Sequence, residues 1–221
     1  MTEIIPAIMP KSLEDLKEKV SLVEGLVSFV QVDVMDGKFV ESISWPVGSA
    51  GDLEKMAKGE IKLNEGVETD YEVDLMVSDP ENYILPWSEA GAKRLIFHIE
   101  GIEDAETFLD NLKRDGLEIG LALNIDTPNE DIYPFVSKVD FIQFMGISKI
   151  GFQGEKFDER VLDKIKDLRQ NYPNVIISVD GGVNLETASG LVEAGVNRLA
   201  SGSAIFRSGN IPEAIKKLEN F

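Results

Sequence analysis

Acidic side chains interrupt apolar, strand-length runs of this sequence at several places. Asp33 lies in VQVDVMDG, Asp74 in YEVDLMV and Asp180 in ISVDGG. A carboxylate in a protein interior is costly unless it is paired, hydrogen-bonded or bound to a metal. Two acids that face each other across a ligand can remove a proton from one side of a carbon atom and deliver one to the other. Asp33 and Asp180 are therefore candidates for acid–base catalysis, although either acid alone could simply bind a backbone amide or a lysine.

Glycine-rich turns follow the later apolar runs. They contain Gly151 and Gly154 in IGFQGEKF, Gly181 and Gly182 in DGG, and Gly202 and Ser203 in ASGSAIF. Backbone amides and helix amino termini at such turns favour anions, and phosphate is a common ligand after the last strands of an α/β barrel. These residues are candidate phosphate-binding positions, and simple tight turns are the alternative. Three methionines also end apolar runs (Met35, Met76 and Met145), where core packing is the more common role.

The apolar runs alternate with segments of helical periodicity, a pattern typical of a parallel sheet with crossover helices. Predicted strands cover residues 4–9, 29–35, 71–77, 94–99, 118–124, 141–147, 175–180 and 198–201. Residues 12–24 and a segment near 52–58 are predicted helices, and Ser12, Asp79, Asn184 and Asn210 are predicted to start helices as N-caps. Most strand runs are apolar throughout, as expected when both faces of each strand are buried.

Eight strands in strict βα order within 221 residues favour closure of the sheet. We predict an α/β fold, a (β/α)8 TIM barrel that forms a single domain over residues 1–221. An open doubly wound sheet is the rival architecture. It usually carries a GxGxxG turn after its first strand, and this sequence has none there.

The composition limits the classes of partner. The chain has 22 basic and 40 acidic residues, a net charge of −18, and such a surface repels nucleic acid. No stretch approaches the roughly 20 apolar residues of a membrane span. The absence of cysteine excludes disulfides and thiolate metal sites. The first residues lack the features of a secretory signal, so we expect a cytoplasmic protein.

Motifs along nearly the whole chain resemble those of the ribulose-phosphate 3-epimerase family. They are VQVDVMDGKFV, VDLMVSDPENYI, AGAKRLIFHIEG, GLALNIDTP, VDFIQFM, ISVDGGV and AGVNRLASGSAIF, in the family's order. The resemblance implies an isomerase that inverts C3 of a ketopentose 5-phosphate through an enediolate, with Asp33 and Asp180 as acid and base. It also implies that Met35, Met76 and Met145 lie over the reacting carbon. A phosphosugar is the implied small-molecule partner, and the resemblance allows a homo-oligomer.

The family holds a divalent metal with two histidines and the two aspartates, and this chain departs from that pattern. Gln31 and Asp74 stand at the histidine positions, and the one histidine, His98, matches a different family position, where a local hydrogen-bonding role is expected. The resulting set is Gln31, Asp33, Asp74 and Asp180. All-oxygen ligands suit Mg²⁺ or Mn²⁺ better than Zn²⁺, so the identity of the metal (Mg, Mn, Fe or Zn) stays open.

The substrate side departs from the family as well. Ala7 and Pro10 replace serines of the first strand, and Lys149 replaces a proline in the loop after the sixth strand. A catalytically inactive phosphosugar-binding barrel that has lost its metal is therefore the alternative function. A third alternative, a related barrel decarboxylase or aldolase, needs a lysine in an Asp-x-Lys-x-x-Asp motif, where this chain has Met76.

Overall fold

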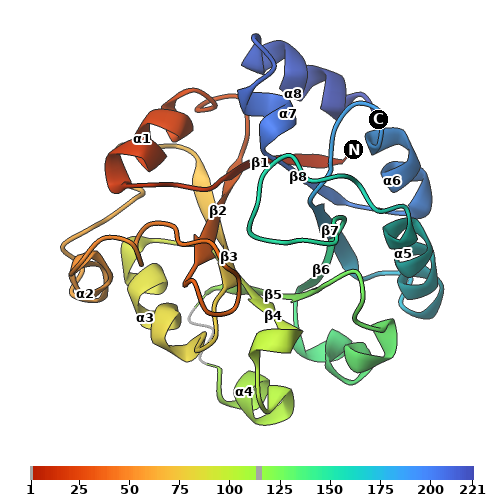
Figure 1. Cartoon of the computed structure of the whole chain (residues 1–221), viewed down its shortest axis with the longest axis horizontal. Coiled ribbons are helices and arrows are strands. Elements are labelled where there is room, and N and C mark those ends of the chain that lie inside the picture. Colours follow the sequence, from red (N-terminus) through yellow and green to blue (C-terminus); the bar gives the residue numbers. More distant parts are fainter. Residues whose placement is uncertain (1, 113–115) are drawn as a thin grey trace.

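The computed structural model describes residues 2–112 and 116–221, which include eight parallel strands closed into a barrel (Figure 1). The strands are β1 (Glu3–Ile8), β2 (Phe29–Met35), β3 (Asp70–Met76), β4 (Arg94–His98), β5 (Glu118–Leu123), β6 (Phe141–Met145), β7 (Ile176–Asp180) and β8 (Arg198–Ser201). Each strand pairs with its neighbours in chain order, and β8 closes the barrel by pairing with β1. The predicted (β/α)8 TIM barrel is confirmed.

Helices surround the barrel on its outside, as Figure 1 shows. They are α1 (Leu13–Ser21), α2 (Asp52–Ala57), α3 (Glu81–Ala90), α4 (Ala105–Asn111), α5 (Arg160–Asn171), α6 (Ala188–Ala194), α7 (Ser203–Phe206) and α8 (Ile211–Glu219). Three short 3₁₀ helices supplement them: η1 (Ile99–Gly101), η2 (Asn129–Asp131) and η3 (Tyr133–Lys138). The segment between β5 and β6 contains only η2 and η3, so no α-helix covers that crossover.

The strands lie where the apolar runs predicted them because the barrel interior and the helices bury both faces of each strand. β2 and β8 have the predicted bounds, and the other strands differ by one or two residues at an end. β6 stops at Met145 because the chain leaves the ladder there, and Ile147 instead forms a bridge with Phe157.

Two of the four predicted helix caps are confirmed. Asp79 is not a cap, because Pro80 is the residue before α3 and no side chain accepts a bond there. The side chains of Ser12 and Asn210 accept hydrogen bonds from backbone amides in the first turns of α1 and α8. The prediction for Asn184 is wrong in position, since Thr187 is the residue before α6. The Asn184 side chain accepts bonds from the amides of Glu186 and Thr187, so it caps the turn that leads into that helix.

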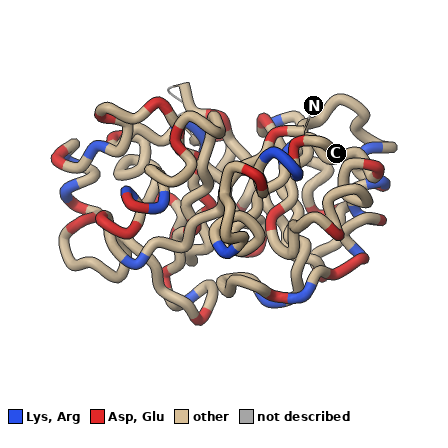
Figure 2. The backbone as a smooth tube through the Cα atoms, turned by 90° about the horizontal axis from the view of Figure 1, so that it is seen from above, with Lys and Arg blue, Asp and Glu red and all other residues tan. Residues whose placement is uncertain are grey.

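Charged residues occupy two levels of the barrel. At the amino ends of the strands, Arg94 and Arg198 pair with Glu3, Glu72 and Glu118. The second level lies toward the carboxyl ends, where α/β barrels bind ligands. On the surface, basic residues are scattered among acidic ones (Figure 2). In the described part of the chain, no helix has the length and apolar character needed to cross a membrane.

Candidate active site

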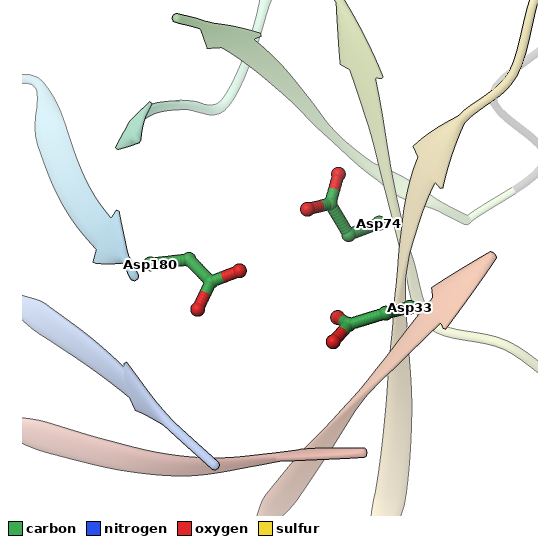
Figure 3. A group of neighbouring side chains, drawn as sticks. All are labelled: Asp33, Asp74 and Asp180. Atoms are coloured by element: carbon green, nitrogen blue, oxygen red, sulfur yellow. The ribbon is translucent and has the colours of Figure 1, made fainter. Parts of the chain in front are cut away.

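Three aspartates from three strands converge inside the barrel (Figure 3). Asp33 and Asp74 are register partners on β2 and β3, and Asp180 ends β7. One oxygen from each carboxylate lies within 4.8 Å of the others. The strands run in parallel and their side chains alternate between the interior and the helices. Acids from distant parts of the sequence therefore share one small volume.

Gln31 links two of these carboxylates. It lies two residues before Asp33 on β2, so both side chains take the same face of the strand. Its Nε2 donates to Oδ1 of Asp33 at 2.9 Å and to Oδ2 of Asp180 at 3.0 Å. Its Oε1 is buried, with no hydrogen-bond partner among the described residues. A buried amide oxygen without a donor is unusual, and a bound water or ion is one way to satisfy it.

The environment of Asp33 and Asp180 favours their neutral forms. Burial raises the pKa of Asp33 well above its ordinary value, and the nearby Asp180 and Asp74 carboxylates raise it further. Burial and Asp74 likewise raise the pKa of Asp180, while Gln31 opposes the shift. Two interacting acids of this kind can hold one proton between them, so one is poised to donate and the other to accept.

Asp74 has a different set of partners. Nε2 of His98 lies 3.0 Å from its Oδ1, and Nε2 of Gln143 donates to its Oδ2 at 3.2 Å. The hydroxyl of Ser178 in turn donates to Oε1 of Gln143 at 3.2 Å. Burial alone would lower the pKa of His98, but Asp74, helped by Glu100, raises it to about 10. His98 therefore has the local hydrogen-bonding role predicted for it, with Asp74 as its partner.

Gln143 and Ser178 were not singled out as site residues in the sequence. Both are fully buried polar residues within otherwise apolar strands, FIQFM and IISVD. The available signal was strand parity, because Gln143 precedes Met145 by two residues and must share its face.

The residues predicted to hold a metal fit a hard divalent cation. Asp33, Asp74 and Asp180 offer three carboxylate oxygens, and hydrogen bonds to a carboxylate leave lone pairs free for a cation. A half-turn of the Gln31 amide exchanges its nitrogen and oxygen, which would point the unpartnered Oε1 at the space between Asp33 and Asp180. These donors are all oxygen, the type preferred by Mg²⁺ and Mn²⁺.

A cavity of about 210 Å³ opens above the acids, and most of the predicted substrate residues line it. They are Asp33, Met76, Met145, Gly151, Gly154, Asp180, Gly181, Gly182, Gly202 and Ser203. Gln31 and Asp74 are fully buried and do not line the cavity. Ala7 and Ala200 make part of the wall, and Glu155 adds an acid that was not predicted. None of the described lining residues is Lys or Arg.

Met35 does not line this cavity, although it was predicted to contact substrate. It is buried and packs with Met76 and Val40. The loop between β6 and α5 covers it, since a Cβ atom on Gly151 would lie 3.0 Å from Val40 and 3.5 Å from the sulfur of Met35. Figure 1 shows this loop lying across the barrel mouth.

The glycines have close steric surroundings. Gly181 and Gly182 have φ angles of 96° and 71°, which favour glycine. A Cβ atom on Gly182 would lie 2.9 Å from the backbone of Phe157, and one on Gly202 would lie 2.9 Å from the carbonyl oxygen of Ala7. These turns therefore bring main chain directly to the cavity wall.

Comparison with known proteins agrees with the motifs. The model of the Ribulose-phosphate 3 epimerase family matches residues 3–206. Ribulose-phosphate 3-epimerase of Schizosaccharomyces pombe is 32% identical over 99% of this chain and 92% of its own length. The enzyme of that name from Bacillus subtilis is 31% identical over 99% of this chain and 98% of its own. Among solved structures, 3-hexulose-6-phosphate synthase from Salmonella typhimurium has a TM-score of 0.67 at 15% identity over 99% and 97% of the two chains, a likeness of fold. The chain belongs to the ribulose-phosphate 3-epimerase family.

Proposed function

We propose that this protein interconverts D-ribulose 5-phosphate and its C3 epimer by proton transfer between Asp33 and Asp180. The observation that carries the proposal is the convergence of these two buried carboxyl groups, bridged by Gln31, on the wall of a cavity in a chain of this family. Asp33 comes from β2 and Asp180 from β7, so the two groups approach the cavity from different sides (Figure 3).

The proposed chemistry uses one ionised and one protonated carboxyl group. The ionised acid removes the proton from C3, which lies beside the C2 carbonyl, and an enediolate forms. The protonated acid then delivers its proton to the opposite face of C3, and the configuration inverts. The upward pKa shifts of both acids support this assignment, because a raised pKa lets a carboxyl group keep its proton and act as a general acid.

Gln31, Asp33, Asp74 and Asp180 would hold a divalent cation, for which we propose Mg²⁺ or Mn²⁺ because all the donors are oxygen. Such a cation supplies positive charge beside the substrate oxygens that become negative when C3 loses its proton. The chain's own contribution there is to keep these acids desolvated and fixed. His98 and Gln143 restrain Asp74. In the absence of the cation, the Gln31 amide restrains the other two acids.

The remaining cavity residues would bind the rest of the sugar. We propose that the backbone around Gly181, Gly182, Gly202 and Ser203 binds the 5-phosphate, since no lysine or arginine among the described residues lines the cavity. Met76 and Met145 offer an apolar wall over the reacting carbon. Met35 would act from beneath, through its contact with Met76.

The inactive barrel and the decarboxylase are less well supported. Three carboxylates within one small buried volume destabilise a fold unless a cation compensates for them. A barrel that no longer binds a cation would have no compensation for these three aspartates. A barrel decarboxylase would need a charged lysine at the position of Met76, which is a buried apolar residue here.

A coupled assay of D-ribulose 5-phosphate conversion tests the proposal, first with chelated protein and then with Mg²⁺, Mn²⁺, Fe²⁺ or Zn²⁺ added. Turnover that depends on Mg²⁺ or Mn²⁺ is the expected result. Phosphosugar binding without turnover under every condition would favour the inactive barrel.

A further inference from the structure

A continuous line of buried side chains crosses the barrel interior to Asp74. The hydroxyl of Ser178 on β7 donates to Oε1 of Gln143 on β6, and Nε2 of Gln143 donates to Oδ2 of Asp74 on β3. Nε2 of His98 on β4 holds the other oxygen, Oδ1, at 3.0 Å. Ser178, Gln143 and Asp74 are 0% exposed, and His98 is 2% exposed.

The chemistry of the groups fixes the direction of every bond. A carboxylate that binds a cation only accepts hydrogen bonds, so the Gln143 amide must present its nitrogen to Asp74. Its oxygen then faces β7, where Ser178 is its register partner and donates the hydroxyl proton. A hydrophobic side chain at position 178 would leave Oε1 of Gln143 without a donor in the barrel interior, which is costly.

We propose that Gln143, oriented by Ser178, is a positioning residue that holds Asp74 as a cation ligand. The inference rests on the proposed function, in which Asp74 supplies one oxygen to the cation. Asp74 is fully buried beside Asp33 and Asp180, and the negative charge that these two acids share would turn its oxygens away if nothing held them. Gln143 and His98 donate from two sides and leave lone pairs on each oxygen for a cation.

This arrangement also accounts for two polar residues that the proposed proton transfer does not use. Gln143 and Ser178 do not line the cavity and cannot touch a sugar there. Burying these two polar side chains costs free energy, which their hydrogen bonds or a function must offset. Restraint of a ligand carboxylate is a role that fits the bond from Gln143 to Asp74 and the bond from Ser178 to Gln143.

The test is titration of full-length protein with Mn²⁺, followed by electron paramagnetic resonance, with thermal unfolding of the metal-free proteins to check folding. Gln143→Met removes the donor and keeps the length of the side chain. Ser178→Ala frees the amide, and Ser178→Thr keeps a hydroxyl. Thr69→Val is the matched control, because Thr69 is 1% exposed and its hydroxyl has no partner among the described residues.

We expect Gln143→Met to weaken Mn²⁺ binding by about 10- to 100-fold, the usual cost of losing a residue that orients a metal ligand. Ser178→Ala should weaken it less, Ser178→Thr should restore it, and Thr69→Val should match the wild type. In the coupled assay, Gln143→Met should lower kcat at saturating substrate more than it raises KM.

The two proposals fail in different ways. Equal Mn²⁺ affinity in the wild type and Gln143→Met would overturn the positioning role and leave the proposed function standing. If Gln143→Met binds Mn²⁺ more weakly but the wild type shows no turnover, the positioning role is supported and the proposed reaction is contradicted. A wild type that binds no Mn²⁺ would overturn both the cation site and this inference.

Discussion

The guanidinium of Arg94 lies 3.1 Å from the carboxylate of Glu72, and both side chains are buried at the end of the barrel away from the cavity. Arg94 also pairs with Glu3 and Glu118 and stacks over the ring of Phe29. Breaking a buried ion pair leaves a desolvated charge and destabilises a protein strongly. This end of the barrel therefore has a role in stability that is separate from the chemistry at the other end.

Glu72 should make stability depend on pH. Burial raises its pKa to about 7, although Arg94 opposes the shift. The folded protein then binds this proton more tightly than the unfolded chain does. Its contribution to stability is full below about pH 4.5 and is lost as the pH rises through 7. The whole contribution is at most on the order of 3 kcal/mol, and Glu72→Gln should remove it.

Urea unfolding at pH 5.5 and pH 8 checks this prediction. The wild type should lose more unfolding free energy between the two pH values than Glu72→Gln does. The pKa values of Asp33 and Asp180 are also raised, so Glu72→Gln retains part of the pH dependence of stability. Glu65→Gln, at an exposed position, serves as the control. Identical pH dependence in the wild type and Glu72→Gln would contradict the role given to Glu72.

The barrel was predictable because eight apolar runs are buried on both faces and alternate with helical segments. Strand ends were less predictable, as β6 illustrates. Ile147 continues its apolar run, but a bridge to Phe157 takes that residue out of the barrel. The tertiary contact decides this boundary, and the residue type does not reveal it.

The site was predictable where acids interrupt apolar strands, as Asp33, Asp74 and Asp180 do. The role of Met35 could not be read in the same way, because a loop more than a hundred residues later in the chain covers it at Gly151. Gln143 was the reverse case. Its position two residues before Met145 placed it inside the barrel, but only the structure shows that Asp74 lies within its reach.

Asp33→Asn and Asp180→Asn should each lower turnover by at least about 100-fold, the lower range for loss of a general acid or base. Asparagine keeps the size of the side chain and removes its ability to take up a proton. The measurement is conversion of D-ribulose 5-phosphate to its C3 epimer, which needs both acids, followed by NMR. Both variants should remain folded, because burial disfavours the charge that they remove.

Asp167→Asn is a suitable control for these variants, because Asp167 lies on α5 and bonds to Asn129 and Tyr133 outside the barrel. Its rate of epimerisation should match that of the wild type. Epimerisation at the wild-type rate in Asp33→Asn or Asp180→Asn would refute the assignment of that residue as acid or base.

Gln31→His should change the choice of metal. Imidazole favours Zn²⁺ over Mg²⁺, and an amide oxygen has the opposite preference. We expect Zn²⁺ affinity to rise by at least about tenfold relative to Mg²⁺ affinity, while Gln31→Leu weakens both. Competition titrations on chelated protein measure the ratio. An unchanged ratio in Gln31→His would show that position 31 does not contact the cation.

Gly202→Ala should damage substrate binding more than chemistry. An added Cβ atom would lie 2.9 Å from the carbonyl oxygen of Ala7 and 3.2 Å from Nε2 of Gln153, so this wall of the cavity must shift. The acids lie on other strands, and their geometry should be retained. We expect KM for D-ribulose 5-phosphate to rise at least about tenfold, with kcat changed much less. The reason is that the lost contact stabilises the bound substrate and the transition state equally.

Gly190→Ala is the control for this variant. Gly190 lies in α6, and an added Cβ atom would meet only Leu162, at an ordinary contact distance of 3.9 Å. Alanine should therefore leave KM unchanged and raise the unfolding free energy by up to about 1 kcal/mol, the difference in helix propensity. Binding of inorganic phosphate separates two explanations for a raised KM in Gly202→Ala. Weaker phosphate binding would show that this turn binds the phosphate, whereas unchanged phosphate binding would show that the phosphate binds elsewhere in the cavity.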